Sequence, residues 1–266
     1  MKKTTIIAGL LFAGLLAANH VGATTITQWN FNSNPADGSS STGSTSPSVG
    51  TGSVSLIGGT TSTFASGSPS DPAATDNTGY NLTSWAAQST GSGTAGLQVN
   101  ASTVGYSNIV LSLDFRQSGT VSRFWQLQVS QDGSTFNNVS GGTASVGTIG
   151  SGNTGTSFSS AGLYSDNPGG GSQNFVQALT YTLATGSVYE NDATSAFRWV
   201  AVFDPSSGTS YISANAGTTS AYSTSGTGRF DMVGVSGTVE VVPEPSSLAL
   251  AAVGLGALLK FRARKK

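Results

Sequence analysis

Between residues 24 and 242, apolar side chains recur at every second position and show no helical spacing. In the segment 109–115, every second residue is Ile, Leu, Leu or Phe, and two of the three residues between them are polar. Such alternation places the apolar side chains on one face of an extended strand and the polar ones on the other. Strands of this kind must bury their apolar faces against another layer. The alternation therefore predicts an all-β fold.

Further segments repeat the alternation, and turns rich in Gly, Ser and Asn separate them. The predicted strands lie at residues 29–31, 54–57, 97–99, 108–116, 121–129, 175–183, 197–203 and 233–241. Many short strands between such turns indicate a β-sandwich with a jelly-roll-like core. Leu111 and Trp199 are predicted core residues on facing or neighbouring strands. The polar segments 32–52, 66–79 and 140–160 are predicted loops, and the first of them could equally be a disordered linker.

Cysteine is absent from all 266 residues, and the single histidine, His20, lies before residue 24. The segment 24–242 therefore cannot use disulfides, thiol chemistry, Ser-His-Asp or Cys-His catalysis, or zinc held by Cys or His. Its stability must come from a buried core alone.

The charges of the chain are unevenly distributed. Residues 24–242 contain four arginines, no lysine and eleven acidic residues, which gives this part a net charge of −7. The arginines are Arg116, Arg123, Arg198 and Arg229. Nucleic acids and anionic lipids are recognised by clusters of basic side chains. The sequence therefore predicts no nucleic-acid partner for this domain.

Residues 1–23 have the layout of a secretory signal peptide. Two lysines precede an apolar stretch at residues 6–18, and Val21-Gly22-Ala23 supplies small residues before a cleavage site. The apolar stretch is short for a membrane span. We expect signal peptidase to remove this segment and the domain at residues 24–242 to be exported. An uncleaved N-terminal anchor is the alternative.

The segment 243–266 has three parts. Pro243-Glu244-Pro245 comes first, an apolar stretch at residues 248–259 follows, and a basic cluster ends the chain. The basic residues of that cluster are Lys260, Arg262, Arg264, Lys265 and Lys266. The prolines separate this segment from the preceding strand, and the apolar stretch predicts a short hydrophobic helix in the membrane. The basic cluster should stay cytoplasmic, which leaves the domain outside.

This C-terminal segment resembles the PEP-CTERM sorting signal, in which a Pro-Glu-Pro motif precedes a short hydrophobic helix and an Arg/Lys-rich end. The resemblance implies an inner-membrane-anchored precursor that exosortase processes near Pro243-Glu244-Pro245. It also implies delivery to the cell surface or extracellular matrix and association with exopolysaccharide or biofilm. A plain tail anchor is the alternative.

Two aromatic residues are the candidates for ligand binding. Trp85 lies in a polar stretch close to Tyr80, and exposed aromatic rings stack well on the apolar faces of sugars. The alternative is that Trp85 packs in the core, as most tryptophans do.

No cofactor is predicted, apart from calcium as a candidate structural ion. Calcium prefers oxygen ligands, and the sequence offers two loop pairs, Asp71 with Asp76 and Glu190 with Asp192. Solvated loop carboxylates are the alternative for both pairs.

No catalytic residue is predicted. Glycoside hydrolysis needs two carboxylates that flank the bond, and Glu190-Asn191-Asp192 matches only the start of a glucanase motif, because Ser195 stands where that motif has its next glutamate. The segment 130–136, which contains Asp132-Gly133, is predicted to form a hairpin turn. The leading expectation is a non-enzymatic exported surface or matrix protein. The alternatives are a carbohydrate-binding module that acts on exopolysaccharide and, after it, a secreted Asp/Glu hydrolase.

Overall fold

The structure is a computed structural model that describes residues 22–73, 75–150, 153–167, 174–215 and 221–240. In these residues every regular element is a β-strand, and there are fourteen of them. They are β1 (Thr24–Trp29), β2 (Ser53–Ile57), β3 (Thr61–Ser66), β4 (Thr78–Thr83), β5 (Gly96–Asn100), β6 (Tyr106–Gln117), β7 (Phe124–Ser130), β8 (Asn137–Asn138), β9 (Thr143–Ser145), β10 (Thr154–Phe158), β11 (Leu163–Asn167), β12 (Val176–Thr182), β13 (Ala196–Val202) and β14 (Gly228–Val239).

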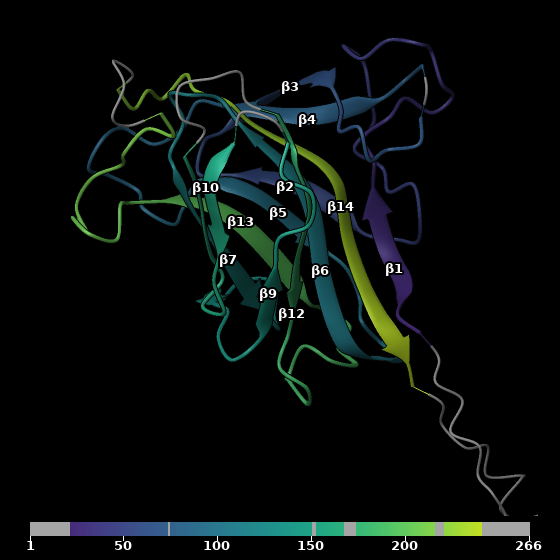
Figure 1. Cartoon of the computed structure of the whole chain (residues 1–266). Coiled ribbons are helices and arrows are strands. Elements are labelled where there is room, and N and C mark those ends of the chain that lie inside the picture. Colours follow the sequence, from purple (N-terminus) through teal and green to yellow (C-terminus); the bar gives the residue numbers. More distant parts are fainter. Residues whose placement is uncertain (1–21, 74, 151–152, 168–173, 216–220, 241–266) are drawn as a thin grey trace, which may run out of the picture.

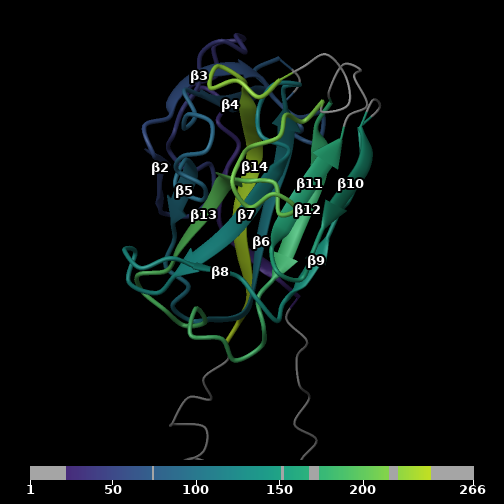
Figure 2. The same cartoon turned by 90° about the vertical axis from the view of Figure 1, so that its left-hand side faces the viewer.

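These strands form two seven-stranded antiparallel sheets that pack face to face (Figure 1 and Figure 2). Sheet A has the order β3-β4-β14-β6-β12-β9, with β1 also paired to β14. Sheet B has the order β10-β11-β7-β13-β5-β2, with β8 also paired to β7. The chain crosses repeatedly from one sheet to the other, which is a connectivity of the jelly-roll kind. The prediction of an all-β sandwich is confirmed.

The longest strands form where the alternation is clearest. In sheet A, β6 and β14 lie side by side, and their register places Phe115 opposite Phe230 and Leu111 opposite Val235. All four side chains are buried. Trp199 lies on β13 in sheet B and is also buried. The prediction that Leu111 and Trp199 are core residues on facing or neighbouring strands is confirmed, and the two strands lie in different sheets.

Two of the predicted loops contain strands. β4 begins inside the segment 66–79, and β9 and β10 both lie within 140–160. A polar segment can join a sheet through main-chain hydrogen bonds, because these bonds do not depend on apolar side chains. Strand β3, for example, pairs with β4 from Thr61 opposite Thr83 to Ser66 opposite Thr78. Threonine-rich segments suit strands well, but they lack the alternation on which the prediction depended.

Aromatic rings fill the centre of the sandwich. Phe115 has no exposed surface, and four other rings surround it. Its ring centroid lies 4.7 Å from that of Trp125, 4.8 Å from Phe230, and 5.8 Å from both Tyr164 and Trp199. Ring pairs at these separations add to the stabilisation from buried area. The core thus provides the stability that disulfides supply in other exported domains.

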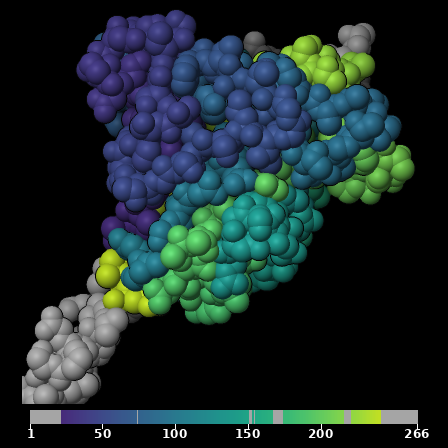
Figure 3. Space-filling model, turned by 180° about the vertical axis from the view of Figure 1, so that it is seen from behind, coloured from purple at the N-terminus to yellow at the C-terminus, as the bar shows by residue number. Residues whose placement is uncertain are grey.

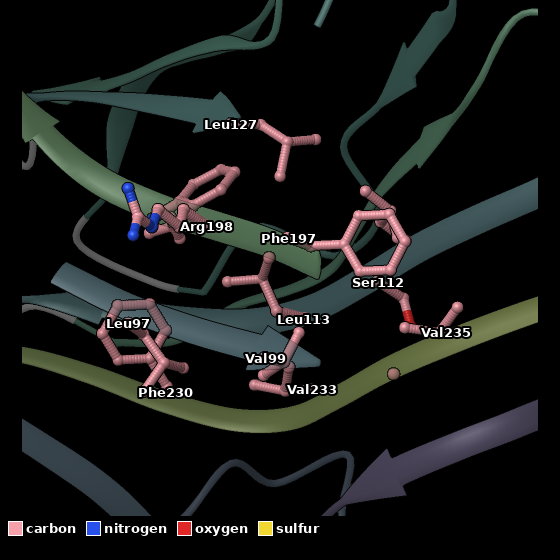
Figure 4. A pocket seen from close by; sticks show the side chains of 13 residues that line it. Leu97, Val99, Ser112, Leu113, Leu127, Phe197, Arg198, Phe230, Val233 and Val235 are labelled. Atoms are coloured by element: carbon pink, nitrogen blue, oxygen red, sulfur yellow. The ribbon is translucent and has the colours of Figure 1, made fainter. Parts of the chain in front are cut away.

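A small apolar cavity of about 30 Å³ lies between the two sheets (Figure 4). Side chains from β5, β7 and β13 line one side of it, and side chains from β6 and β14 line the other. It has room for about one water molecule, but a buried water needs polar partners that this lining does not supply. The cavity is therefore a packing gap rather than a ligand site.

The segment 32–52 is an ordered loop. Val49 forms an isolated bridge with Gln28, and Ser44 N donates to Phe31 O at 3.1 Å. In the space-filling view from behind, residues of this N-terminal region, in purple and blue, form a continuous layer over the upper part of the molecule (Figure 3). The disordered-linker alternative is therefore wrong.

The hairpin turn predicted at Asp132-Gly133 joins β7 to β8. Asp132 Oδ1 accepts hydrogen bonds from the backbone N–H groups of Thr135 at 2.7 Å and Ser134 at 2.8 Å. These bonds, that from Thr135 most of all, hold the pKa of the Asp132 carboxyl well below its usual range. Gly133 supplies the positive φ of 69° that the turn requires. The prediction of a hairpin turn is confirmed.

The domain begins and ends at one pole. Thr24 at the start of β1 lies opposite Gly237 near the end of β14 (Figure 1), and we call this end the terminal pole. At the other end, Gly228 of β14 pairs with Gln117 of β6, and we call this end the distal pole. Strands of this length span on the order of 40 Å. The two poles are therefore well separated.

Several predictions concern residues that the structure does not describe. The apolar part of the signal peptide, the short hydrophobic helix at 248–259 and the basic cluster that follows it lie outside the described residues. Within the described ranges, no helix is long and apolar enough to cross a membrane. The domain boundaries at 23/24 and 242/243 stay predictions.

Residues 24–242 expressed alone are expected to form a soluble, monomeric, β-rich domain. The reason is that, among the described residues, the buried apolar side chains of the core lie between Trp29 and Val235. Far-ultraviolet circular dichroism and size-exclusion chromatography test this expectation. A strongly helical or random-coil spectrum would contradict it.

Candidate functional site

The two aromatic residues expected to bind sugar are part of the core. Trp85 is 4% exposed, its ring packs edge-on against Trp125 at 5.0 Å, and its Nε1 donates to Gly226 O at 2.7 Å. Tyr80 is 7% exposed and stacks on Phe31 at 5.1 Å. Neither ring presents the exposed face that stacking on a sugar requires. Trp85 therefore packs in the core, which was the alternative to sugar binding. Its sequence neighbours are polar, but the chain around Gly226 covers its ring.

The predicted calcium pair Glu190 and Asp192 organises the backbone of its own loop. Glu190 Oε1 accepts from Asn108 N at 2.9 Å, and its Oε2 accepts from Gly186 N at 3.1 Å. Asp192 Oδ1 accepts from Thr194 N at 2.6 Å. Hydrogen bonds of this kind are the usual use of loop carboxylates. The structure therefore gives these two residues a role that needs no metal ion.

The other predicted calcium pair, Asp71 and Asp76, lies in a buried loop. Asp71 accepts hydrogen bonds from Asn32 Nδ2 at 2.8 Å and from Ala73 N at 2.9 Å. Asp76 is 4% exposed, and neither of its carboxylate oxygens has a hydrogen-bond partner among the described residues. A buried carboxylate without a partner is costly, so Asp76 is the carboxylate in this loop that a bound cation would stabilise most.

Calcium at Asp76 stays a prediction. No group of three or more His, Cys, Asp or Glu side chains in the described ranges is arranged to hold a metal, so carbonyl and hydroxyl oxygens would have to complete the six to eight ligands that calcium takes. We expect calcium chloride to raise the melting temperature relative to EDTA, and Asp76→Asn to abolish that increase. Glu190→Gln is the matched control and should retain it. Equal melting temperatures of the wild-type protein in calcium and EDTA would contradict the prediction.

Two further acidic residues face each other across the centre of sheet A. Asp114 on β6 lies opposite Asp231 on β14, and both are buried, at 3% and 0% exposure. Ser68 N donates to Asp231 at 2.6 Å and Met232 N donates at 2.7 Å. The pKa of Asp231 is nevertheless raised to about 8. Burial is the main cause, and the nearby charges of Asp71 and Asp114 add to it.

A neutral Asp231 suits its surroundings. Asn77 Oδ1 is buried without a partner among the described residues. This oxygen and Asp231 Oδ2 both lie on the side of Gly67 where the Cβ of any other residue would stand. A protonated carboxyl has a donor for such an acceptor, whereas an ionised one has none. Asp114, in contrast, accepts hydrogen bonds from Ser70 Oγ and from Ala178 N. The pair thus places the neutral carboxyl of Asp231 beside that of Asp114, beneath the loop that contains Ser68 and Ser70.

The raised pKa of Asp231 predicts that the domain loses stability as the pH rises. The folded protein keeps a proton at pH values where the unfolded chain, with a carboxyl pKa of 3.8 against about 8, has released it. The contribution is therefore complete below about pH 4, declines between about pH 4 and 8, and then levels off. Asp231→Asn should remove this decline and stabilise the domain at pH 8 by the order of a few kcal/mol. Urea unfolding at several pH values measures it, and Asp204→Asn should keep the decline of the wild type.

A polar hollow lies at the distal pole, around two arginines. Arg116 near the end of β6 lies directly opposite Arg229 at the start of β14. Because their neighbours Phe115 and Phe230 point into the core, the two arginines point to the outer face of sheet A. The hollow has a volume of about 260 Å³ and is lined by Arg116, Gln117, Ser118, Gly119, Asn215, Thr227 and Arg229.

The two arginines differ in their hydrogen bonds. Arg229 Nε donates to Asn81 Oδ1 at 3.3 Å, and its Nη1 donates to Ser66 O at 2.9 Å. Arg116 makes no hydrogen bond within the part of the chain that the structure describes, and neither arginine forms an ion pair there. Burial lowers the pKa of Arg229 to about 10, and the charge of Arg116 adds to this effect. The site therefore holds two positive charges side by side without an internal counter-charge.

One feature of the sequence points to the hollow around Arg116 and Arg229, although no prediction was based on it. Only four arginines occur in the acidic segment 24–242, and Arg116 and Arg229 each follow or precede an inward-facing phenylalanine on a strand. Alternation alone places such arginines on the outer face. That they stand opposite each other depends on the pairing of β6 with β14, which are more than a hundred residues apart in the chain.

The comparisons with known proteins concern the end of the chain. The PEP-CTERM protein-sorting motif matches residues 241–265, directly after β14, and this confirms the resemblance seen in the sequence. No match to a curated protein was found. The fold and this motif together define an all-β sandwich with a C-terminal sorting signal. The protein is an exported protein that exosortase sorts and processes.

Proposed function

We propose that the protein is a non-enzymatic component of the cell surface or extracellular matrix, held there by association with exopolysaccharide. The observation that carries this proposal is the PEP-CTERM motif at residues 241–265, because such a signal delivers the domain in front of it to the outside. The sandwich supports a role in the matrix, since it combines a large aromatic core with a surface that is poor in charge. Only 9% of all residues of the chain are charged, against about 25% in typical soluble proteins.

The geometry of the domain suits delivery by a C-terminal tail. The described chain starts and ends at the terminal pole, where Thr24 lies opposite Gly237. A precursor held by its C-terminal segment would therefore present the distal pole to the exterior. Release at Pro243-Glu244-Pro245 would leave the sandwich intact, because β14 ends at Val239.

A secreted hydrolase is the alternative that one observation favours. Asp114 and Asp231 form a close pair with one raised pKa, as acid and base pairs in active sites do. Their exposures of 3% and 0% argue against this use, because a glycosidic bond must reach both carboxyl groups. Release of reducing ends from exopolysaccharide by the wild-type protein, lost in Asp231→Asn, would support the hydrolase and overturn the non-enzymatic proposal.

Fractionation of a biofilm tests the proposal. Cells that make both exosortase and exopolysaccharide should retain the processed protein in the matrix fraction. A strain of the same background without the polysaccharide should release the processed protein into the medium. Retention on cells of both strains in equal amounts would overturn the proposed association with exopolysaccharide.

A further inference from the structure

We propose that the hollow around Arg116 and Arg229 binds the carboxylate of an acidic sugar, such as a uronic-acid residue of a polysaccharide. The proposed function is the ground for expecting a sugar, and the geometry of the hollow is the ground for expecting an acidic one. The inference therefore rests on the proposed function and names the ligand class that it left open.

The positive charge of the two arginines is uncompensated among the described residues. Like charges directly opposite each other on neighbouring strands destabilise a sheet, and Arg116 lies opposite Arg229 in the register of β6 and β14. The domain has eleven acidic residues, yet none of them lines the hollow. The two on the same strands, Asp114 and Asp231, accept hydrogen bonds from Ser70 and Ser68 instead. An anionic ligand supplies the counter-charge that the described residues do not.

The donors of the two arginines are well placed for a ligand. Nε and Nη1 of Arg229 are held by Asn81 and Ser66, which fixes the plane of the guanidinium and leaves Nη2 without a hydrogen bond among the described residues. Arg116 makes no hydrogen bond to the rest of the described chain, so all its donors remain for a ligand. The planar fork of a guanidinium matches the two oxygens of a carboxylate. A donor that the protein already holds in place also loses less entropy on binding.

The rest of the lining consists largely of small or hydroxyl-bearing residues, among them Ser118, Gly119 and Thr227. Hydroxyl groups such as those of Ser118 and Thr227 can both donate to and accept from a sugar hydroxyl. The hollow thus combines donors for an anion with groups that can hydrogen-bond a sugar hydroxyl.

The size and position of the hollow agree with a sugar of a long polymer. A volume of about 260 Å³ is slightly below the roughly 300–1,000 Å³ of sites for drug-sized ligands, which suits one sugar residue rather than several. The hollow lies at the distal pole, away from Thr24 and Gly237. It would therefore face the matrix while the tail still holds the precursor in the membrane.

Calorimetry with a matched pair of sugars tests the inference. The protein is purified after export from cells that carry out their own signal-peptide removal and sorting. The probes are a short oligomannuronate and the same oligosaccharide after reduction of its carboxyl groups to alcohols. We expect the wild-type protein to bind the oligomannuronate, and the Kd to rise about tenfold or more for the reduced sugar or for Arg116→Ala. Arg198→Ala is the control, because Arg198 lies over Phe136 and outside the hollow, and its Kd should stay within about twofold of the wild type.

A second substitution separates charge from shape. Arg116→Lys keeps the positive charge but lacks the planar fork, so it should bind more weakly than the wild type and more tightly than Arg116→Ala. The alanine variant should fold, because Arg116 makes no hydrogen bond that its removal would break among the described residues. If the alanine variant does not fold, two other comparisons test the inference. One is the affinity of Arg116→Lys against that of the wild type, and the other is the affinity of the wild type for oligomannuronate against that for the reduced sugar.

Three outcomes would overturn the inference. They are no binding of oligomannuronate by the wild-type protein, equal affinity for the reduced sugar, and unchanged affinity in both Arg116 variants. Tighter binding of a dextran sulfate oligosaccharide than of oligomannuronate would also overturn the assignment to a carboxylate. The proposed function fails separately, because the biofilm fractionation reports retention in the matrix and calorimetry reports binding by the purified protein.

Discussion

Replacing Pro243, Glu244 and Pro245 together by alanine is expected to leave the protein in the inner-membrane fraction with its C-terminal segment intact. The motif at residues 241–265 is the signal that exosortase recognises. We expect the two prolines to favour an extended chain around Glu244, which is the conformation that a processing enzyme engages. Alanine favours helix instead, so the variant loses both the recognition residues and the extended backbone. The expected redistribution is close to complete.

Cell fractionation and intact-mass measurement check this result. Deletion of residues 248–266 is the matched control, because it removes the apolar segment that is expected to hold the precursor in the membrane. That variant should be released without sorting. Surface material of the wild-type protein that still ends in Arg264-Lys265-Lys266 would contradict processing, and a plain tail anchor would then explain the segment.

Trp199→Ala is expected to lower the free energy of unfolding by about 3–5 kcal/mol, as large-to-small changes at buried aromatic positions do. Trp199 is 3% exposed, and its ring lies 5.5–5.8 Å from those of Phe115, Phe158 and Tyr164. Its removal leaves a void between two sheets whose backbones cannot close it. Chemical denaturation of the purified protein measures the loss.

Two further substitutions separate the cavity from other effects. Trp199 Nε1 has no hydrogen-bond partner among the described residues, so Trp199→Phe gives up no hydrogen bond and should cost clearly less than Trp199→Ala. Val188 is 59% exposed, and Val188→Ala should stay within about 0.5 kcal/mol of the wild type. A cost near zero for Trp199→Ala would mean that the two sheets do not pack as described.

The central strands were predictable because two-residue periodicity reports directly on burial. The segment around Leu111 and Phe115 and the segment around Trp199 both alternate, and both form strands whose apolar side chains are buried. Strands β3 and β4 were not predicted, because β3 is rich in Thr and Ser and hydrogen bonds to a neighbour stabilise it without an apolar face. Periodicity detects burial, whereas pairing between strands leaves no trace in a single strand's sequence.

The candidate sites divide in the same way. The sorting motif was readable from the sequence, because exosortase recognises a short linear segment. Trp85 was misjudged, because its polar sequence neighbours did not show that Trp125 and Gly226 cover its ring.

The sequence by itself determined the all-β class, the absence of His and Cys side chains from residues 24–242, and the sorting of the protein. Each of these depends on composition, on short-range periodicity or on a linear motif. Only the tertiary structure decided that Arg116 stands opposite Arg229 and that Asp114 stands opposite Asp231. Both contacts join residues more than a hundred positions apart. The register of β6 and β14 creates them, and that register depends on how the whole core packs rather than on any local stretch of the chain.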